Sequence, residues 1–207
     1  MYRELVGDTE TQRLAGGVGD NLRARSRIVA GLRAFFVARD YLEVDTPLLV
    51  PSPGLDLHLD AFAVAGAGFL ITSPEYQMKR LLAGGLSRIF QLARCFRRGE
   101  LGQRHQREFT MLEWYRAGGT LADLMDETAA LVASVHPGLG PVTRLTVAEA
   151  FATHADGADA LALAESDEEQ FSRTLVDRVE PALATRGAVM LHHFPASQAS
   201  LARICPD

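Results

Sequence analysis

In the middle of the chain, side-chain character alternates from one residue to the next, as is typical of β-strands. Two nine-residue stretches, residues 88–96 and 108–116, flank a turn that is rich in arginine. Because successive strand residues point to opposite faces, the second stretch places every other side chain on one face. The side chains on that face are Phe109, Met111, Glu113 and Tyr115. The pattern predicts a hairpin in which an aromatic ring, a carboxylate and a phenol share one side.

Helical spacing of apolar residues predicts helices on both sides of this hairpin. The first is expected to start at an Asp20 N-cap and to run to about Arg39 with one apolar stripe. The second is expected to start at a Ser73 N-cap, with Pro74 as its first residue, and to end near Gly84. Further helix starts are predicted at Thr120 and at two capping boxes, Thr146…Glu149 and Ser166…Glu169.

Shorter strand patterns complete the predicted elements, at residues 41–44, 57–64, 69–71 and 188–194. Strands that follow one another without regular crossover helices favour an antiparallel sheet flanked by helices, which is an α+β fold. Residues 1–21 are expected to form a loose N-terminal tail, and residues 22–207 one domain.

Composition narrows the class of protein. The 207 residues are 47% hydrophobic and 23% charged, which is ordinary for a globular protein with a sizeable core. No apolar run is long enough for a membrane span and no signal-peptide pattern opens the chain, so we expect a cytoplasmic protein without membrane contact. Cys95 and Cys205 give neither a disulfide framework nor a metal-ligand spacing, and the six histidines form no metal-binding motif.

Charge is distributed unevenly along the chain. The formal net charge is -5, yet five arginines fall within fourteen residues, at Arg94, Arg97, Arg98, Arg104 and Arg107. A general nucleic-acid binder more often spreads basic residues over a whole face. The local cluster is more typical of a site for a small phosphorylated ligand, because the guanidinium fork matches phosphate oxygens. A solvated basic turn is the alternative interpretation.

The segment Thr72-Ser73-Pro74-Glu75 also has two interpretations. Ser-Pro-Glu is a common helix start, and a glutamate there is stabilised by the helix dipole without any ligand. Alternatively, Glu75 is a carboxylate fixed at a strand–helix junction, where it can accept a hydrogen bond from an ammonium group. Local sequence alone favours the helix start.

Four segments, in this order, resemble the catalytic domain of class II aminoacyl-tRNA synthetases of the lysyl branch. They are RSRIVAGLRAFFVARDYLEVDTPLL, TSPEYQMKRLL, FQLARCFRRGELGQRHQREFTMLEWYR and HHFPASQASLA. The similarity is greatest to the stand-alone paralogues that attach lysine, usually β-lysine, to elongation factor P. It covers about residues 22–205, so we interpret residues 22–207 as a partial class II catalytic domain. The resemblance implies a motif 1 dimer segment at Arg25–Pro47 and a motif 2 hairpin at Phe90–Arg116.

The resemblance also implies roles for individual residues. Arg97 matches the arginine that binds the α-phosphate of ATP and is the expected catalytic residue. The other implied ATP-binding positions are Arg98, Gly99 and Glu100 in the loop, His105 and Gln106 toward the terminal phosphates, and Phe109 against adenine. The implied amino-acid pocket is formed by Ser73, Pro74, Glu75, Glu113 and Tyr115. In that pocket Glu75 is expected to meet the α- or β-amino group, and Glu113 and Tyr115 the lysine side chain.

The implied reaction has two steps. The carboxylate of lysine or β-lysine attacks the α-phosphorus of ATP with Mg²⁺ as cofactor, and a lysine amine of elongation factor P then attacks the aminoacyl-adenylate. A homodimer through motif 1 is implied, and no tRNA partner is expected. The family's loop commonly reads His-Asn-Pro-Glu-Phe, whereas this chain has His105-Gln106-Arg107-Glu108-Phe109. Gln106 and Arg107 are therefore expected to change the loop geometry.

The chain ends at Asp207, before the family's metal-binding acids and its motif 3. We therefore expect no metal ligands within this sequence, and no lysine-dependent ATP–pyrophosphate exchange from these 207 residues alone. Two further readings stay open. One is an inactive or regulatory truncated paralogue. The other is a fragment of a lysyl-tRNA synthetase, which the short segment before motif 1 disfavours because it leaves no room for an anticodon-binding barrel.

Overall fold

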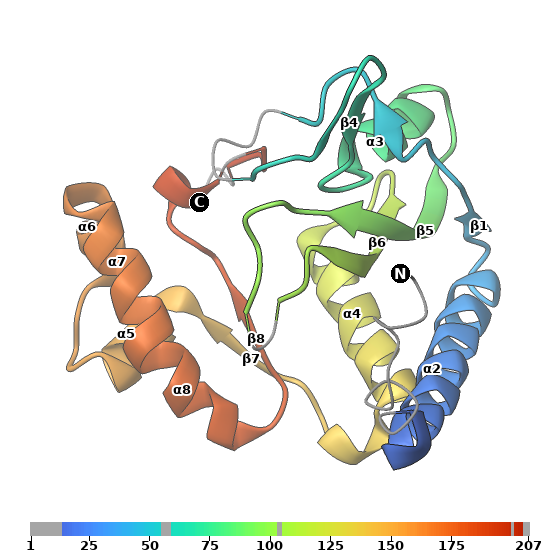
Figure 1. Cartoon of the computed structure of the whole chain (residues 1–207). Helices are drawn as coiled ribbons and strands as arrows, with labels where there is room; N and C mark the ends of the chain where they lie inside the picture. Colours follow the sequence, from blue (N-terminus) through green and yellow to red (C-terminus); the bar gives the residue numbers. More distant parts are fainter. Residues whose placement is uncertain (1–13, 55–58, 103–104, 200, 205–207) are drawn as a thin grey trace. The chain divides into compact units, whose positions relative to one another are not determined.

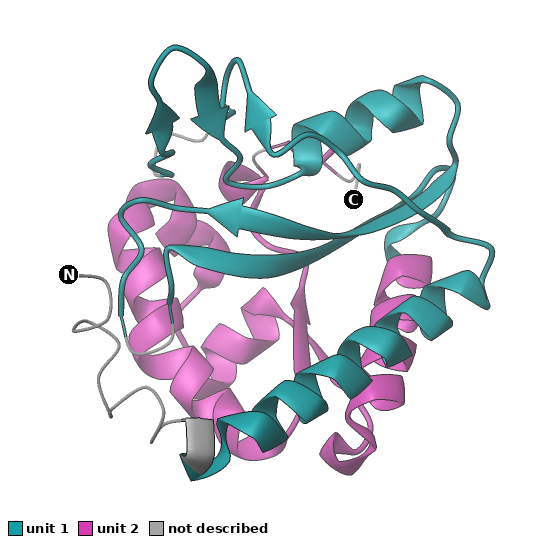
Figure 2. Cartoon of the chain, turned by 45° about the vertical axis from the view of Figure 1, so that its right-hand side comes forward, with its two compact units in different colours: residues 1–121 teal, residues 122–207 magenta. Residues whose placement is uncertain are grey.

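The computed structural model describes residues 14–54, 59–102, 105–199 and 201–204 (Figure 1). The chain divides into two compact units, residues 1–121 and 122–207, which Figure 2 shows in different colours. Helices and three small sheets are present in the described part, consistent with an α+β fold. These sheets replace the single antiparallel sheet that the sequence predicted. No helix in the described part of the chain is long and apolar enough to cross a membrane.

The predicted hairpin is the main feature of the first unit (Figure 1). Strands β5 (Arg88–Phe96) and β6 (Glu108–Arg116) have the bounds expected from the sequence and pair antiparallel over their whole length. A third strand, β1 (Leu42–Glu43), runs parallel to β5, so the strand order is β1-β5-β6. The register places Gln91 opposite Glu113 and Cys95 opposite Phe109. The hairpin therefore has two distinct faces.

Helix α2 (Gly19–Val37) packs on one face of the hairpin through aromatic rings. Phe36 is fully buried, and its ring stacks on Phe90 with centroids 4.7 Å apart and lies 5.6 Å from Trp114. Phe90 and Trp114 occupy alternate positions to those of the predicted site face. Burial of these large rings accounts for much of the stability of this unit.

The start of α2 differs from the prediction. Val18 is at the N-cap position, so Asp20 lies in the first turn, where its carboxylate pairs with Arg23 at 2.9 Å. Acidic side chains are favourable throughout a first turn, which is why the sequence does not distinguish the two positions. A short turn, η1 (Leu14–Val18), precedes α2, so residues 14–21 are not the loose tail expected; residues 1–13 lie outside the described part.

The other face of the hairpin is covered by a small antiparallel sheet. Its order is β2-β4-β3, with β2 at Leu49–Val50, β4 at Gly68–Leu70 and β3 at Ala63–Val64. Val50 and Ile71 of this layer pack with residues of the hairpin, namely Ala93, Cys95, Phe109 and Met111. The strand predicted at 57–64 is reduced to β3, and residues 55–58 lie outside the described part. Gly68 has φ +128° and a Cβ there would lie 2.4 Å from the Val50 carbonyl oxygen, so glycine is required.

The second unit is mainly helical. Its elements are α4 (Leu121–Val135), η2 (Pro137–Leu139), β7 (Thr143–Thr146), α5 (Val147–His154), α6 (Ala160–Ser166), α7 (Glu168–Thr174), η3 (Leu175–Val179), α8 (Glu180–Leu183), η4 (Ala184–Arg186), β8 (Val189–His192) and η5 (Ala196–Gln198). The core of this unit includes Phe151 stacked on Phe171. Strands β7 and β8 pair in parallel, which the intervening helices permit.

The two predicted capping boxes have different outcomes. The box at Thr146…Glu149 is confirmed: both reciprocal hydrogen bonds are present at the start of α5. The box at Ser166…Glu169 is wrong, because α6 ends at Ser166 and the N-cap of α7 is Asp167, whose carboxylate accepts from the Gln170 N–H at 2.9 Å. Asp and Ser are comparable N-caps, so adjacent candidates compete.

Candidate functional site

Glu113 lies at the centre of the polar part of the hairpin's site face, the face that carries Phe109, Met111, Glu113 and Tyr115. The Tyr115 hydroxyl donates to Glu113 Oε1 at 2.5 Å, and the Ser73 hydroxyl donates to Glu113 Oε2 at 3.0 Å. Both carboxylate oxygens are thus held by hydroxyl donors, in a partly buried position. A carboxylate fixed in this way is pre-organised to receive a cation.

The environment of Tyr115 keeps its phenol protonated. Burial raises the pKa of Tyr115 far above its ordinary value, the hydrogen bond to Glu113 raises it further, and the negative charges of Glu113 and Glu75 add to the effect. The phenol therefore acts as a hydrogen-bond donor at any physiological pH. It cannot supply a negative charge to a ligand, so the charge of this part of the site belongs to the carboxylates.

Helix α3 (Glu75–Ala83) begins beside this carboxylate. Pro74 occupies its N-cap position, one residue later than predicted, while the Ser73 Oγ accepts a hydrogen bond from the Glu75 N–H at 3.1 Å. Ser73 thereby links the helix start to Glu113. The Glu75 carboxylate forms an ion pair with Lys79, with 2.5 Å between Oε1 and Nζ. Sequence analysis did not assign a role to Lys79.

Arg97 lies at the end of β5 and is held by three groups. Its Nε donates to the Thr72 carbonyl oxygen at 3.3 Å, and its Nη1 pairs with Glu100 Oε1 at 3.0 Å. The guanidinium carbon lies 5.1 Å from the centroid of the Phe109 ring, within the range of a cation–π contact. Arg97 therefore contacts both Glu100 and Phe109, which the resemblance placed in the same ATP site.

The loop between the strands presents the remaining predicted ATP-binding residues. Arg98 is fixed to Asp60, through its N–H to the Asp60 carbonyl at 2.8 Å and through an ion pair at 3.3 Å. His105 and Gln106 are exposed, and the His105 carbonyl accepts from the Gly102 N–H at 3.1 Å. Residues 103–104, which include Arg104 of the predicted cluster, lie outside the described part.

Cys95 lies on the site face, opposite Phe109, and is fully buried. Burial raises the pKa of its thiol to about 11; the negative charge of Glu113 adds to this rise and the positive charge of Arg97 opposes it. The thiol therefore stays protonated near neutral pH. It packs as a small apolar group rather than acting as a nucleophile.

Three partners of the site were missed by sequence reasoning: Asp60, Thr72 and Lys79. Lys79 could have been found, because Glu and Lys four residues apart on a helix are expected to pair. The Thr72 contact uses a main-chain carbonyl, and Asp60 is distant from Arg98 in sequence. Neither leaves a signal in a single sequence.

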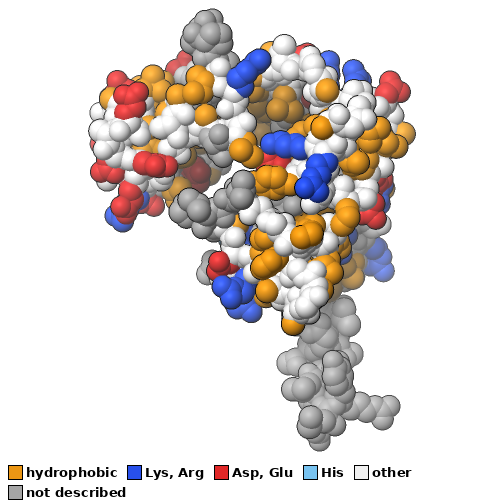
Figure 3. Space-filling view, turned by 90° about the horizontal axis from the view of Figure 1, so that it is seen from above, with side chains coloured by type: hydrophobic (Ala, Val, Ile, Leu, Met, Phe, Trp, Pro, Cys, Tyr) orange, Lys and Arg blue, Asp and Glu red, His pale blue; other side chains and the backbone are white. Residues whose placement is uncertain are grey.

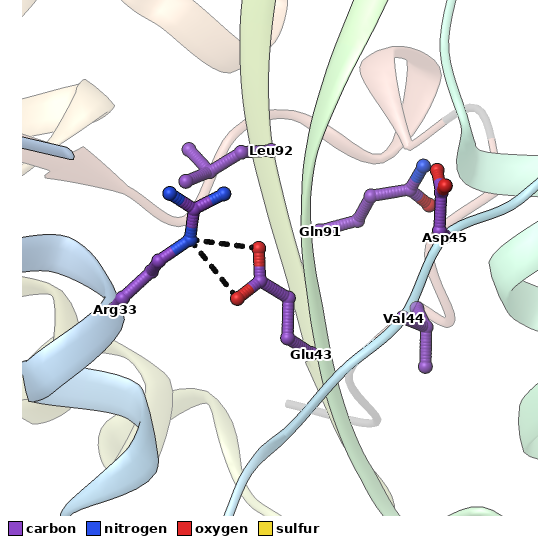
Figure 4. A pocket seen from close by; sticks show the side chains of 6 residues that line it. All are labelled: Arg33, Glu43, Val44, Asp45, Gln91 and Leu92. Carbon is purple, nitrogen blue, oxygen red and sulfur yellow. Dashed lines mark hydrogen bonds and ion pairs between the residues drawn. The ribbon is translucent and has the colours of Figure 1, made fainter. Parts of the chain in front are cut away.

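A cavity of about 530 Å³ lies where β1 separates from β5 (Figure 4). Its lining residues are Arg33, Glu43, Val44, Asp45, Gln91 and Leu92. The Arg33 Nε donates to both Glu43 oxygens at 2.9 and 3.0 Å, and the Thr46 hydroxyl donates to Gln91 Oε1 at 2.9 Å. None of the residues predicted to bind ATP or an amino acid lines this cavity.

Several arginines near the site are paired with carboxylates. On the face seen in Figure 3, basic side chains are scattered among hydrophobic and acidic ones over the described residues. The basic groups of the predicted turn are partly neutralised, since Arg94, Arg97 and Arg98 pair with Glu108, Glu100 and Asp60 respectively. Among the described residues, three of the predicted arginines therefore form ion pairs, and the pairs of Arg94 and Arg98 are exposed to solvent.

Comparison with known proteins agrees with this arrangement. Residues 14–202 match the family model of tRNA synthetases class II (D, K and N). The chain is 38% identical over 215 residues to the elongation factor P--(R)-beta-lysine ligase of Klebsiella pneumoniae (strain 342) and 39% identical to that of Salmonella paratyphi B. Each alignment covers 90% of this chain and 66% of the relative. The resemblance inferred from the four segments is confirmed, and the chain belongs to the class II tRNA synthetase family (D, K and N).

Proposed function

We propose that this protein is an ATP-dependent ligase that activates lysine or β-lysine as an aminoacyl-adenylate and transfers it to a lysine of elongation factor P. The observation that carries the proposal is the site face itself, where Arg97 with Phe109 and Glu113 with Tyr115 lie along one strand pair. The names of the relatives support the choice of substrate and partner. Since the chain spans 66% of the relatives' length, the activity is proposed for the whole protein.

The ATP half of the proposed site is built on Arg97. Its guanidinium would bind the α-phosphate, and the Phe109 ring beside it would stack on adenine. Arg98, Gly99 and Glu100 would border the nucleotide, and the exposed His105 and Gln106 would reach the terminal phosphates. Because Arg97 is already oriented by Thr72 and Glu100, little side-chain freedom would be lost on binding.

Mg²⁺ fits this site as a companion of the nucleotide. In the described residues no group of three or more His, Cys, Asp or Glu side chains lies close enough to hold a metal ion. Mg²⁺ often keeps several waters and is held largely by substrate phosphates, so it would enter this site with ATP. When bound, the ion would offset negative charge on the phosphates.

The amino-acid half is formed by the carboxylates. Glu113, held by Tyr115 and Ser73, would accept the side-chain ammonium of lysine, and Glu75 would accept the α- or β-ammonium. Pro74 is buried and fixes the direction in which the helix, and with it Glu75, leaves the strand. Two separate carboxylates select a substrate that carries two ammonium groups.

The proposed chemistry follows from these positions. The substrate carboxylate attacks the α-phosphorus, pyrophosphate leaves, and Arg97 stabilises the charge that develops on the α-phosphoryl oxygens. A lysine amine of elongation factor P then attacks the adenylate carbonyl, which forms an amide and releases AMP. No side-chain nucleophile is required, in agreement with the protonated state of Cys95.

We propose that the protein acts as a cytoplasmic homodimer through residues 25–47. Apolar side chains are exposed along α2 and β1, which supports a protein contact there. These side chains include Ile28, Val37 and Leu42.

The test is modification of elongation factor P, followed by intact mass spectrometry, with the full-length protein, ATP, Mg²⁺ and either lysine or β-lysine. We expect a mass increase on elongation factor P that depends on both ATP and the amino acid. Charging of lysine tRNA without modification of elongation factor P would support the lysyl-tRNA synthetase reading instead. Binding of ATP and lysine without any product would support the regulatory paralogue.

A further inference from the structure

Lys79 lies one helical turn after Glu75 on α3, and its ammonium contacts Oε1 of the Glu75 carboxylate. The Nζ–Oε1 distance is 2.5 Å. The side chains of Lys79 and Glu75 are 41% and 28% exposed, so the pair is partly shielded from solvent. A Glu–Lys pair four residues apart on a helix contributes little to stability, so stabilisation of the helix is a weak reason for the presence of this pair.

Glu75 is coupled to the rest of the amino-acid pocket. Its N–H donates to Ser73 Oγ, and the same hydroxyl donates to Glu113. The negative charge of Glu75 is also the smallest of the four causes that raise the pKa of Tyr115. Glu75 and Glu113 are thus linked through the Ser73 hydroxyl, and two carboxylates near each other repel.

Lys79 offsets this repulsion and restricts the orientation of Glu75. By holding Oε1, the ammonium limits the rotation of a side chain that has three rotatable bonds. It also leaves the second oxygen as the acceptor for an incoming group. A carboxylate can accept several hydrogen bonds, so one oxygen on Lys79 and the other on a ligand ammonium are compatible.

We propose that Lys79 is a positioning residue of the amino-acid subsite: it holds Glu75 so that the free carboxylate oxygen accepts the α- or β-ammonium of the substrate. The inference rests on the proposed function, because it assumes that Glu75 binds the substrate ammonium. Lys79 itself touches neither substrate nor ATP. Its effect is on the affinity for the amino acid.

The experiment compares Lys79→Met with Lys79→Arg in the full-length protein, using amino-acid-dependent ATP–pyrophosphate exchange. Loss of a charged, positioned hydrogen bond predicts a rise of about tenfold in the KM for the amino acid. The KM for ATP is expected to stay within about twofold, because Arg97 and Phe109 are unchanged. Lys79→Arg keeps a cation on a long stem and is expected to recover most of the affinity.

Arg80→Met is the matched control. It removes a cation from the neighbouring position of α3, where Arg80 is exposed and donates to Gln77 at 3.4 Å. Thermal melting of both variants separates a loss of fold from a loss of affinity, since both are expected to melt close to the unmodified protein. A rise in the amino-acid KM in Lys79→Met but not in Arg80→Met is the expected pattern.

Two results would overturn the inference alone. An unchanged amino-acid KM in Lys79→Met would mean that Glu75 does not need the ion pair. A lowered KM would mean that Lys79 competes with the substrate ammonium for Glu75. Absence of amino-acid-dependent exchange in the unmodified full-length protein would overturn the proposed function together with this inference.

Discussion

The two faces of the β5–β6 hairpin use alternate residues of the same strands for different purposes. On one face Phe90 and Trp114 pack against Phe36 of α2 in an aromatic core. On the other face Glu113, Tyr115 and Arg97 form polar contacts around a candidate site. Since the strands are rigidly paired, burial on the first face fixes the geometry on the second. The comparison predicts that stability and activity can be separated by the face that is mutated.

Phe36→Ala should give the largest effect, and the property it changes is the stability of the fold. Removing a fully buried ring that touches Phe90 and Trp114 is expected to lower the free energy of unfolding by about 3–5 kcal/mol. Chemical denaturation followed by circular dichroism measures it. A loss below about 1 kcal/mol would show that this face is not the core that supports the hairpin.

Arg97→Ala should affect the chemistry instead. Removal of the charged group that would stabilise the α-phosphoryl oxygens is expected to raise the activation free energy of adenylate formation by about 3 kcal/mol. The rate would then fall more than about a hundredfold. Arg94→Ala is the control, because Arg94 lies in β5 on the face opposite to the site face, in an exposed pair with Glu108 at 3.5 Å. Equal losses in the two variants would contradict the division between faces.

Cys95 should be protected from alkylation by the same packing. A thiol whose pKa is raised from 9.0 to about 11 has about one hundredth of the ordinary thiolate at pH 8, so its labelling should be about a hundredfold slower. Because the pKa of the thiol is raised, the rate of Cys95 alkylation should continue to increase with pH until the pH approaches 11. Site-resolved mass spectrometry after iodoacetamide treatment measures it, and rapid labelling at pH 8 would show that the thiol is accessible.

Tyr115→Phe should give the smallest of these effects. Loss of the phenol that donates to Glu113 is expected to raise the KM for lysine by about tenfold and to leave the KM for ATP nearly unchanged. Trp114→Phe, on the opposite face of the same strand, is the matched control and should reduce stability without this shift in KM. Parallel changes of both KM values in Tyr115→Phe would place the residue outside the amino-acid pocket.

Much of unit 1 could be predicted because its signals are long. Each hairpin strand has nine residues, enough for alternation to define both the strand and its site face. Strands β2 and β7 were missed, whereas β1, β4 and β8, which are equally short, were predicted. Parallel pairing of β7 with β8 depends on tertiary packing, which turn and capping signals do not record.

The site could be predicted as a set of residues but not as a set of contacts. The resemblance to class II synthetases named Arg97, Phe109, Glu113 and Tyr115, and the strand register explains why they share a face. It did not reveal that Thr72 orients Arg97 through a carbonyl, or that Ser73 donates to Glu113 while accepting from Glu75. Such contacts depend on where β4 and α3 meet the hairpin.

The most direct test of the central claim is lysine- or β-lysine-dependent ATP–pyrophosphate exchange by the full-length protein, because exchange requires both halves of the site face to act on one adenylate. We predict exchange that needs the amino acid and falls more than about a hundredfold in Arg97→Ala. Exchange that is independent of lysine and β-lysine, or that is unaffected by Arg97→Ala, would contradict the assignment of this face as the activating site.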